Sequence, residues 1–377
     1  MVDPENTAGF WKNGIDPIIA VYTSTGRGEC MKLSYDKGRT FVDYEGNPIL
    51  KHAGEGRDPK VFWYAPGGHW VLVVWDAGVP KKMSLGQQAM VREHSIYTSP
   101  DLKTWTYRSG VPGFFECPDL FELPVEGMPG VKKWVMYDAN GRYVVGDFDG
   151  KELKIDQQLT RYENGGGYFY ASQTYNNAPE GKRIQIGWGR DITHPGMPFN
   201  QAMLFPTELR LRKTIQGEYR LCPTPISGIG SLHKNSQTLE NRVVTTGKNA
   251  ELSVNSDAAL HIVAEFERGD APMVLNILGY ELRYDNEWIF SATPPKGAKA
   301  NTQTPNIYVP KSDVLKIEAI VDKNLLEFFV NDGELYYVAA FNGAKTQKVE
   351  AIAATGETNR KFIVKKLEVH ELTSVWK

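Results

Sequence analysis

Short runs of β-branched and aromatic residues recur along the first 225 positions of the chain. Examples are DPIIAVYTS, KVFWYAP, HWVLVVWDA, KKWVMYDA and RIQIGWGR. Each run is about 5–8 residues long and is bounded by Gly, Pro, Asp or Asn, which is the pattern of β-strands separated by turns. No segment before residue 225 keeps a helical period of apolar residues over three turns. The pattern therefore predicts an all-β chain.

An element made of an aspartate, a turn and an aromatic residue returns along this region. SYDKGRTF (34–41) resembles SPDLKTW (99–105), and GDFDGKEL places Asp149 in a looser copy. Units of several strands that return after about 40–50 residues are typical of propeller blades, and the blades of enzymes carry longer loops. A β-sandwich also has short strands but does not explain this recurrence. We expect about four blades in residues 1–225.

The pattern changes near residue 226. LCPTPISGIGSLHKN is rich in Pro, Gly and Ser, as at a domain boundary, and alternating strands such as AALHIVAEFER and VLKIEAIVDK follow it. The sequence Asn331-Asp332-Gly333 is a hairpin signal between two such strands. This length of alternating strands suits a β-sandwich of about 100–150 residues. We predict a propeller domain over 1–226 and a β-sandwich over 227–377.

Composition excludes several classes of protein. The 43 basic and 45 acidic side chains leave a net charge of -2, which argues against nucleic acid or an anionic membrane as the main partner. Three cysteines (Cys30, Cys117 and Cys222) provide neither a disulfide framework nor a paired-cysteine metal site. The chain has no apolar run long enough to span a bilayer and shows no signal peptide.

Two acidic residues come directly before strands at comparable places in the repeat. Asp58 lies in Arg57-Asp58-Pro59 before KVFWY, and Glu116 lies in Glu116-Cys117-Pro118 before LFELP. Equivalent places on neighbouring blades can converge on the central channel, and a pair of carboxyl groups is what glycosidic bond cleavage requires.

The neighbours of each acid suggest different protonation states. Phe114, Phe115 and Cys117 would desolvate Glu116 and favour its protonated form, which suits a general acid. Arg57 would keep the Asp58 carboxylate ionised if their side chains meet.

Other interpretations of these residues stay open. Asp before Pro is a common turn residue, and Arg-Asp pairs usually lie on solvated surfaces. The side chains of Trp63, Trp70 and Trp188 could form faces on which sugars stack, but Trp188 in IQIGWGR is more often part of a strand core. Cys117 lacks a convincing histidine partner for nucleophilic catalysis.

At these residues the chain resembles glycoside hydrolase family 32, the β-fructosidases that include levanases, exo-inulinases and invertases. Arg57-Asp58-Pro59 is similar to the Arg-Asp-Pro motif of the family, and Glu116-Cys117-Pro118 to its Glu-Cys-Pro motif. The resemblance continues through NTAGF, SYDKGRTFVDYEGNPIL, YVVGDFDG, FYASQTY, RIQIGWGR, PGMPFNQAMLFPTELRLR and LLEFFVNDGE, and so covers essentially the whole chain.

The resemblance implies a five-bladed propeller followed by a C-terminal β-sandwich, and retaining hydrolysis of fructosyl bonds without a metal or organic cofactor. Glu116 would be the general acid/base and Asp58 would stabilise the transition state, with Arg57 beside it. Cys117 and Trp188 would line the fructose site. The substrate would be levan, inulin or sucrose, and family members are often secreted or periplasmic.

One departure from the family pattern concerns the nucleophile. The family carries it as the aspartate of a Trp-Met-Asn-Asp-Pro-Asn-Gly motif, which this sequence lacks. Asp16 follows a superficially similar stretch, but we expect it to be a turn residue. The first blade is thus expected to be missing or incomplete, and inactivity of the chain as given is the alternative that this departure raises.

Two alternatives to a fructosidase follow. One is a homologue that binds fructan without cleaving it. The other, which the Glu-Cys-Pro motif disfavours, is a different propeller glycosidase such as an arabinanase or xylosidase.

Overall fold

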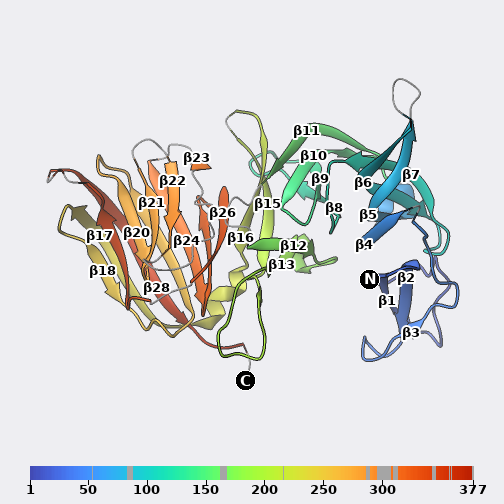
Figure 1. The fold of residues 1–377 in the computed structure, drawn as a ribbon, viewed down its shortest axis with the longest axis horizontal. Helices are drawn as coiled ribbons and strands as arrows, with labels where there is room; N and C mark the ends of the chain where they lie inside the picture. Colours follow the sequence, from blue (N-terminus) through green and yellow to red (C-terminus); the bar gives the residue numbers. More distant parts are fainter. Residues whose placement is uncertain are drawn as a thin grey trace. The chain divides into compact units, whose positions relative to one another are not determined.

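The computed structural model describes residues 1–52, 54–82, 88–161, 168–214, 216–285, 289–294, 307–308, 313–341, 345–355, 357 and 359–375. The regular structure of these residues is almost entirely β-strand (Figure 1), which confirms the all-β prediction. The helices in this part of the chain are three short 3-10 turns: η1 (Ala65–Gly67), η2 (Pro179–Gly181) and η3 (Ser227–Leu232). None of the described helices has the length and apolar character needed to cross a membrane.

The chain divides into two compact units. The first comprises Met1–Arg161, Ala171–Arg183 and Lys213–Tyr219, and the second comprises Tyr162–Tyr170, Ile184–Arg212 and Arg220–Lys377.

Three antiparallel meanders build the first unit, and in each one strands that follow one another in the sequence are paired. The first sheet contains β1 (Ile18–Ser24), β2 (Gly28–Ser34) and β3 (Val42–Asp43). The second contains β4 (Glu55–Tyr64), β5 (His69–Lys82), β6 (Gln88–Ser99) and β7 (Thr106–Pro112). The third contains β8 (Asp119–Pro124), β9 (Lys132–Tyr137), β10 (Arg142–Phe148) and β11 (Leu153–Arg161).

A fourth sheet follows along the chain. Its strands are β12 (Phe169–Thr174), β13 (Ile184–Gly189), β14 (Ala202–Met203), β15 (Thr207–Lys213) and β16 (Tyr219–Pro225). The order is β12-β13-β15-β16, with β14 paired to β13. The described part of residues 1–225 therefore holds four consecutive sheets, as the repeat predicted.

Strand β5 shows how the first three sheets pack. All residues of Trp70–Trp75 are at most 3% exposed. Leu72 and Val74 contribute to the core shared with the first sheet, whereas Val71 and Val73 contribute to the core shared with the third. A strand covered on both faces has no polar side to show, which explains its continuous apolar sequence. This packing places β4, which carries Asp58, and β8, which follows the loop with Glu116, in neighbouring sheets.

The recurring aspartates occupy equivalent turns. Ser34 Oγ donates to Asp36 Oδ1 at 2.8 Å between β2 and β3, and Ser99 Oγ donates to Asp101 Oδ1 at 3.0 Å between β6 and β7. Asp149 accepts two backbone N–H bonds at 2.8 Å between β10 and β11. Each aspartate thus closes the hairpin of the last two strands of its sheet. The repeat read from the sequence is a structural repeat.

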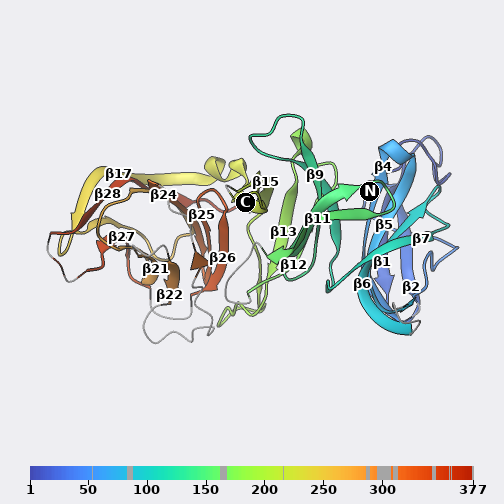
Figure 2. The same cartoon turned by 90° about the horizontal axis from the view of Figure 1, so that it is seen from above.

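Two six-stranded sheets form the sandwich of the second unit, visible as two layers in Figure 2. The first runs β17 (His233–Thr245), β28 (Lys361–Leu372), β19 (Leu260–Glu267), β24 (Val314–Asp322), β25 (Leu325–Val330) and β26 (Leu335–Ala340). The second runs β18 (Ala250–Ser253), β27 (Lys348–Ala353), β20 (Met273–Ile277), β21 (Tyr280–Tyr284), β22 (Ile289–Thr293) and β23 (Ile307–Tyr308).

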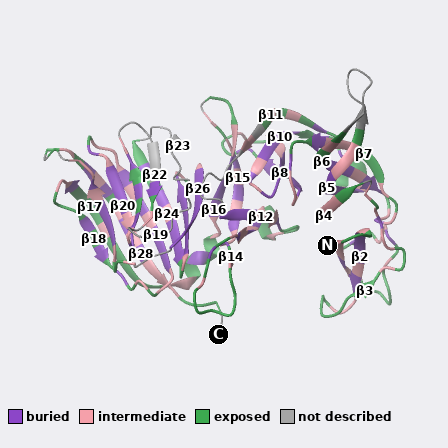
Figure 3. Ribbon diagram, viewed as in Figure 1, coloured by how far each residue is buried: buried purple, intermediate pink, exposed green. Residues whose placement is uncertain are grey.

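Alternating apolar residues of both layers fill the sandwich core. Ile262 and Phe266 of β19 and Leu275 and Ile277 of β20 belong to one buried cluster. Figure 3 shows this burial in the strands and exposure mainly in the loops. The predicted hairpin signal at Asn331-Asp332-Gly333 joins β25 to β26, and all three residues have positive φ angles.

Candidate active site

The Arg57-Asp58-Pro59 segment interrupts the pairing of β4 with β5. The register shifts between Arg57 and Lys60, so Asp58 and Pro59 lie outside the ladder. Pro59 has no N–H to donate, and Asp58 has a left-handed backbone with φ 66°. The N–H of Asp58 donates instead to Thr23 Oγ1 of β1 at 2.9 Å. A strained bulge of this kind turns a side chain away from its sheet and is common next to active sites.

The second motif lies in the loop between β7 and β8. Glu116 and Cys117 also have left-handed backbones, with φ 49° and 43°. The fully buried Asp138 holds this loop, because its Oδ2 accepts the N–H of Phe115 at 3.1 Å. The N–H of Ala139 donates to the carbonyl of Glu116 at 3.1 Å. Two successive left-handed residues without glycine cost roughly 1–3 kcal/mol each, so the loop needs these anchors.

The two motifs contact each other directly. Arg57 donates from Nε and Nη2 to Glu116 Oε1 at 3.0 and 2.6 Å. The backbone N–H of Cys117 donates to Asp58 Oδ2 at 3.0 Å. Each motif therefore binds the carboxylate of the other, and Glu116 and Asp58 lie at one site as their spacing predicted.

Arg57 differs from its expected role. We expected Arg57 to pair with Asp58 and keep that carboxylate ionised. The guanidinium group instead donates its hydrogen bonds to the carboxylate of Glu116. The guanidinium group also lies 4.1 Å from the centre of the Trp75 ring, which packs edge-on against Phe115. Burial lowers the pKa of Arg57, but the hydrogen bond to Glu116 outweighs this and raises it.

The surroundings of Glu116 are less apolar than its sequence neighbours suggested. Its side chain is 20% exposed and is paired with a cation. Phe114 is buried and stacks on His94, away from solvent. The charged Arg57 is therefore a direct neighbour of Glu116, in addition to the apolar residues beside it in the sequence.

Cys117 contributes through its backbone. Its thiol is 3.7 Å from Asp58 Oδ2. Burial raises the pKa of this thiol well above its usual value, and the charges of Asp58 and Glu116 raise it further. A neutral thiol is a poor nucleophile, in agreement with the sequence interpretation.

The three tryptophans have different environments. Trp70 is 3% exposed and donates from Nε1 to Thr7 Oγ1 at 2.7 Å, so it is a core residue and not an open sugar face. Trp63 packs edge-on against Trp70. Trp188 belongs to the second unit, where it is half-buried on β13 and packs edge-on against Tyr170.

Asp16 makes a local contact. Its Oδ1 accepts the N–H of Asp3, 13 residues earlier in the chain, at 3.4 Å. Asp3 itself is buried and accepts the N–H of Ala8 at 2.8 Å. The role of Asp16 as a turn residue stays a prediction.

A buried ion pair behind the motifs was missed by the sequence reasoning. Lys60 Nζ lies 3.2 Å from Asp119 Oδ2, with side chains 8% and 0% exposed. Asp119 Oδ2 also accepts the N–H and hydroxyl of Thr174, both at 2.8 Å. The sequence did contain a signal from which this pair could have been predicted. Lys60 and Asp119 have opposite charges, and each directly follows the proline of one of the two motifs. The pair links β4 to β8, with Lys60 two residues after Asp58 and Asp119 three residues after Glu116.

A cavity of about 670 Å³ lies farther along the same strands of the first unit. Its lining includes Trp63, Trp134, Glu122 and Arg183, but neither Asp58 nor Glu116. It is therefore distinct from the carboxylate pair.

Comparison with known proteins places this chain among the glycoside hydrolases. Residues 2–225 match the glycosyl hydrolases family 32 N-terminal domain, so the chain belongs to this family. The fold is accordingly the propeller-plus-sandwich fold, with four propeller sheets in the described residues.

Individual relatives are fructan- and sucrose-cleaving enzymes by name. A levanase of Bacillus subtilis (strain 168) is 30% identical over 100% of this chain and 60% of its own length. An extracellular exo-inulinase of Meyerozyma guilliermondii is 29% identical over 99% of this chain and 80% of its own length. The chain thus spans less than two thirds of the levanase.

Solved structures share the fold. A fructofuranosidase from Schwanniomyces occidentalis complexed with fructose aligns over 99% of this chain and 83% of its own, with a TM-score of 0.83 and 23% identity. An exo-inulinase from Aspergillus awamori aligns over 100% of this chain and 83% of its own, with a TM-score of 0.81 and 21% identity.

Proposed function

We propose that this protein is a hydrolase of fructosyl bonds in levan, inulin or sucrose. The observation that carries the proposal is the reciprocal contact of the two motifs, which gathers Glu116 and Asp58 at one site. Membership of family 32 and the names of the relatives support the choice of fructosides.

Glu116 is the proposed general acid/base. It would transfer a proton to the glycosidic oxygen as the bond to the fructosyl carbon breaks, and would then take a proton from the incoming water. The pair with Arg57 holds its carboxyl group in one orientation, and the side chain keeps partial access to solvent.

Asp58 is the proposed transition-state stabiliser. As a carboxylate it accepts hydrogen bonds from sugar hydroxyls, and these bonds strengthen as positive charge develops on the sugar ring. The N–H of Cys117 and the bulge of β4 fix its direction. Arg57 and Cys117 are the proposed substrate-binding residues beside it, and the substrate-binding role of Trp188 stays a prediction from the resemblance.

A retaining mechanism also needs a carboxylate nucleophile about 5–5.5 Å from the acid/base. The nucleophile motif of the family does not occur in residues 1–377, so we assign this role to no residue. This observation favours a second candidate function, binding of fructan without cleavage by the same residues.

We also propose that the propeller domain ends near residue 226. Strand β16 ends at Pro225 and β17, the first strand of the sandwich, begins at His233. The 3-10 turn η3 lies between them.

Release of fructose from levan, inulin and sucrose tests the first function, and calorimetry with inulin oligosaccharides tests the second. We expect Glu116→Gln to lower release by several orders of magnitude. The control is Glu122→Gln, an exposed glutamate of β8, which should change nothing. Wild-type binding without release would support the binding protein, and the absence of both would refute both functions.

A further inference from the structure

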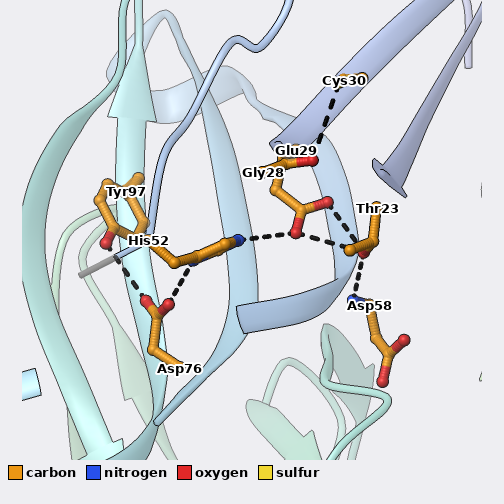
Figure 4. A network of polar contacts seen from close by, with 8 residues as sticks. All are labelled: Thr23, Gly28, Glu29, Cys30, His52, Asp58, Asp76 and Tyr97. Atoms are coloured by element: carbon orange, nitrogen blue, oxygen red, sulfur yellow. Dashed lines mark hydrogen bonds and ion pairs between the residues drawn. The ribbon is translucent and has the colours of Figure 1, made fainter. Parts of the chain in front are cut away.

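A chain of buried polar groups ends on the backbone of Asp58 (Figure 4). The N–H of Asp58 has no partner in the ladder of β4 and β5, because the register shifts there. It donates to Thr23 Oγ1 at 2.9 Å, while the carboxylate of Asp58 points away from Thr23 in Figure 4. The position of Thr23 therefore sets where the Asp58 backbone lies.

Thr23 is itself oriented by Glu29 of β2. The Thr23 hydroxyl group lies 3.2 and 3.0 Å from the two carboxylate oxygens of Glu29. An ionised carboxylate only accepts hydrogen bonds, so the single hydroxyl proton of Thr23 must point toward Glu29. A lone pair of the Thr23 oxygen is then left to accept the hydrogen bond from the Asp58 N–H. The donor and the acceptor of each hydrogen bond between Glu29, Thr23 and Asp58 are thereby fixed.

His52 holds Glu29 in place. His52 Nε2 lies 2.8 Å from Glu29 Oε1, and Nδ1 lies 2.5 Å from Asp76 Oδ1. The side chains of all three are at most 4% exposed. Two carboxylates on opposite sides of one imidazole require both nitrogens to donate, which is the form of the imidazolium cation.

Four strands contribute to the surroundings of His52. Glu29 faces it from β2 and Asp76 from β5, and the Tyr97 hydroxyl of β6 donates to the other oxygen of Asp76 at 3.2 Å. From β4 comes Gly56, where a Cβ would collide with the His52 ring. Burial lowers the pKa of His52, but the hydrogen bonds to Asp76 and Glu29 outweigh this and raise it to about 9.

We propose that Thr23, Glu29, His52 and Asp76 position the substrate-binding carboxylate of Asp58, with His52 as the cation that holds the network together. The inference rests on the role proposed for Asp58. It assigns no contact with substrate to these four residues, which act through the backbone N–H of Asp58. Loss of the His52 charge leaves two buried carboxylates without a cation, and the Glu29–Thr23–Asp58 connection loosens.

Two matched variants of Thr23 test the connection. Thr23→Val keeps the shape but removes the hydroxyl group, and Thr23→Ser keeps the hydroxyl group. We expect hydrogen exchange of the Asp58 amide, followed by NMR, to become about tenfold faster in Thr23→Val and to stay near wild type in Thr23→Ser. We expect kcat for fructose release to fall about tenfold or more in Thr23→Val with a smaller change in KM, and Thr23→Ser to restore it.

The pH dependence tests His52. The Asp58 amide resonance of the wild type should titrate with a midpoint near pH 9, and fructose release should fall through the same range. In His52→Gln both transitions should disappear. If His52 had only a structural role, His52→Gln would lower the thermal stability, but the pH transitions of the Asp58 amide and of fructose release would stay as in the wild type.

The outcomes separate this inference from the proposed function. Wild type without release, or Asp58→Asn with unchanged release, overturns the proposed function, while the Asp58 amide still reports on the network. Thr23→Val with amide exchange and release within twofold of wild type overturns the positioning role. An Asp58 amide resonance that does not titrate near pH 9 overturns the role of His52.

Discussion

Replacement of Lys60 by methionine tests whether the buried pair behind the motifs holds β4 and β8 together. Lys60→Met keeps the length and apolar stem of the side chain but removes its charge. Asp119, whose side chain is fully buried, then loses its cation. Lys60 also donates to the carbonyl of Thr174 at 2.5 Å, and this bond is lost as well.

The contacts of Asp119 determine how much stability Lys60→Met should lose. Removal of one partner from a buried ion pair costs about 3–5 kcal/mol, because the other charge stays buried without compensation. Asp119 keeps two hydrogen bonds from Thr174, so we expect the lower end, about 3 kcal/mol. At about 2–4 °C per kcal/mol, Tm falls by roughly 6–12 °C.

Urea denaturation followed by tryptophan fluorescence measures the free energy of unfolding. The double variant Lys60→Met/Asp119→Asn removes the stranded charge as well, so its loss should be smaller than the sum of the single losses by about 1–3 kcal/mol. The control is Lys132→Met, which breaks an exposed pair with Glu122 and should cost less than about 1 kcal/mol. Equal losses for Lys60→Met and Lys132→Met, or additive losses in the double variant, would refute the reasoning.

Three further predictions concern buried titratable groups. Burial lowers the pKa of His94 to about 3, so between pH 6.5 and pH 3 only the unfolded state binds a proton at this residue. The free energy of unfolding should therefore fall by about 1.4 kcal/mol for each pH unit in this range, as measured by urea denaturation. His94→Leu should flatten this fall, whereas the control His69→Gln should not. Burial raises the pKa of Glu327 to about 7, although the Tyr336 hydroxyl donates to its carboxyl group at 2.6 Å. The folded state therefore keeps this proton up to a higher pH than the unfolded state does, and the free energy of unfolding should decrease as pH rises from 4.5 to 7. The same pH dependence in Glu327→Gln would contradict this. The raised pKa of Cys117 predicts slow alkylation by iodoacetamide at pH 8 in the folded protein and fast alkylation in urea, and equal rates in both would show that the thiol is open.

Much of the fold follows from local patterns. Alternation and turn residues predicted the strands and the hairpin at Asn331-Asp332-Gly333, and the recurrence of Asp36, Asp101 and Asp149 predicted repeated sheets. These features depend on a few neighbouring residues, whose backbone preferences act in any context. The division into contact units was not visible in the sequence, because it depends on which strands meet in space.

The candidate site divides in the same way. Motif residues and their spacing in the repeat predicted that Glu116 and Asp58 meet. Their partners were not predicted: Arg57 binds the carboxylate far along the chain rather than its sequence neighbour, and Asp138 holds the loop from the turn between β9 and β10.

Sequence by itself determined the strands, the repeated turns and the two acidic residues, because each is encoded within a few consecutive positions. Only the tertiary structure decided which charged side chains pair with one another. His52 is an isolated histidine in the sequence, yet the folded sheets place it between Glu29 and Asp76 and connect it to Asp58. A buried charge takes its partner from whatever side chain packing brings within about 3–4 Å, and packing joins residues that the sequence keeps far apart.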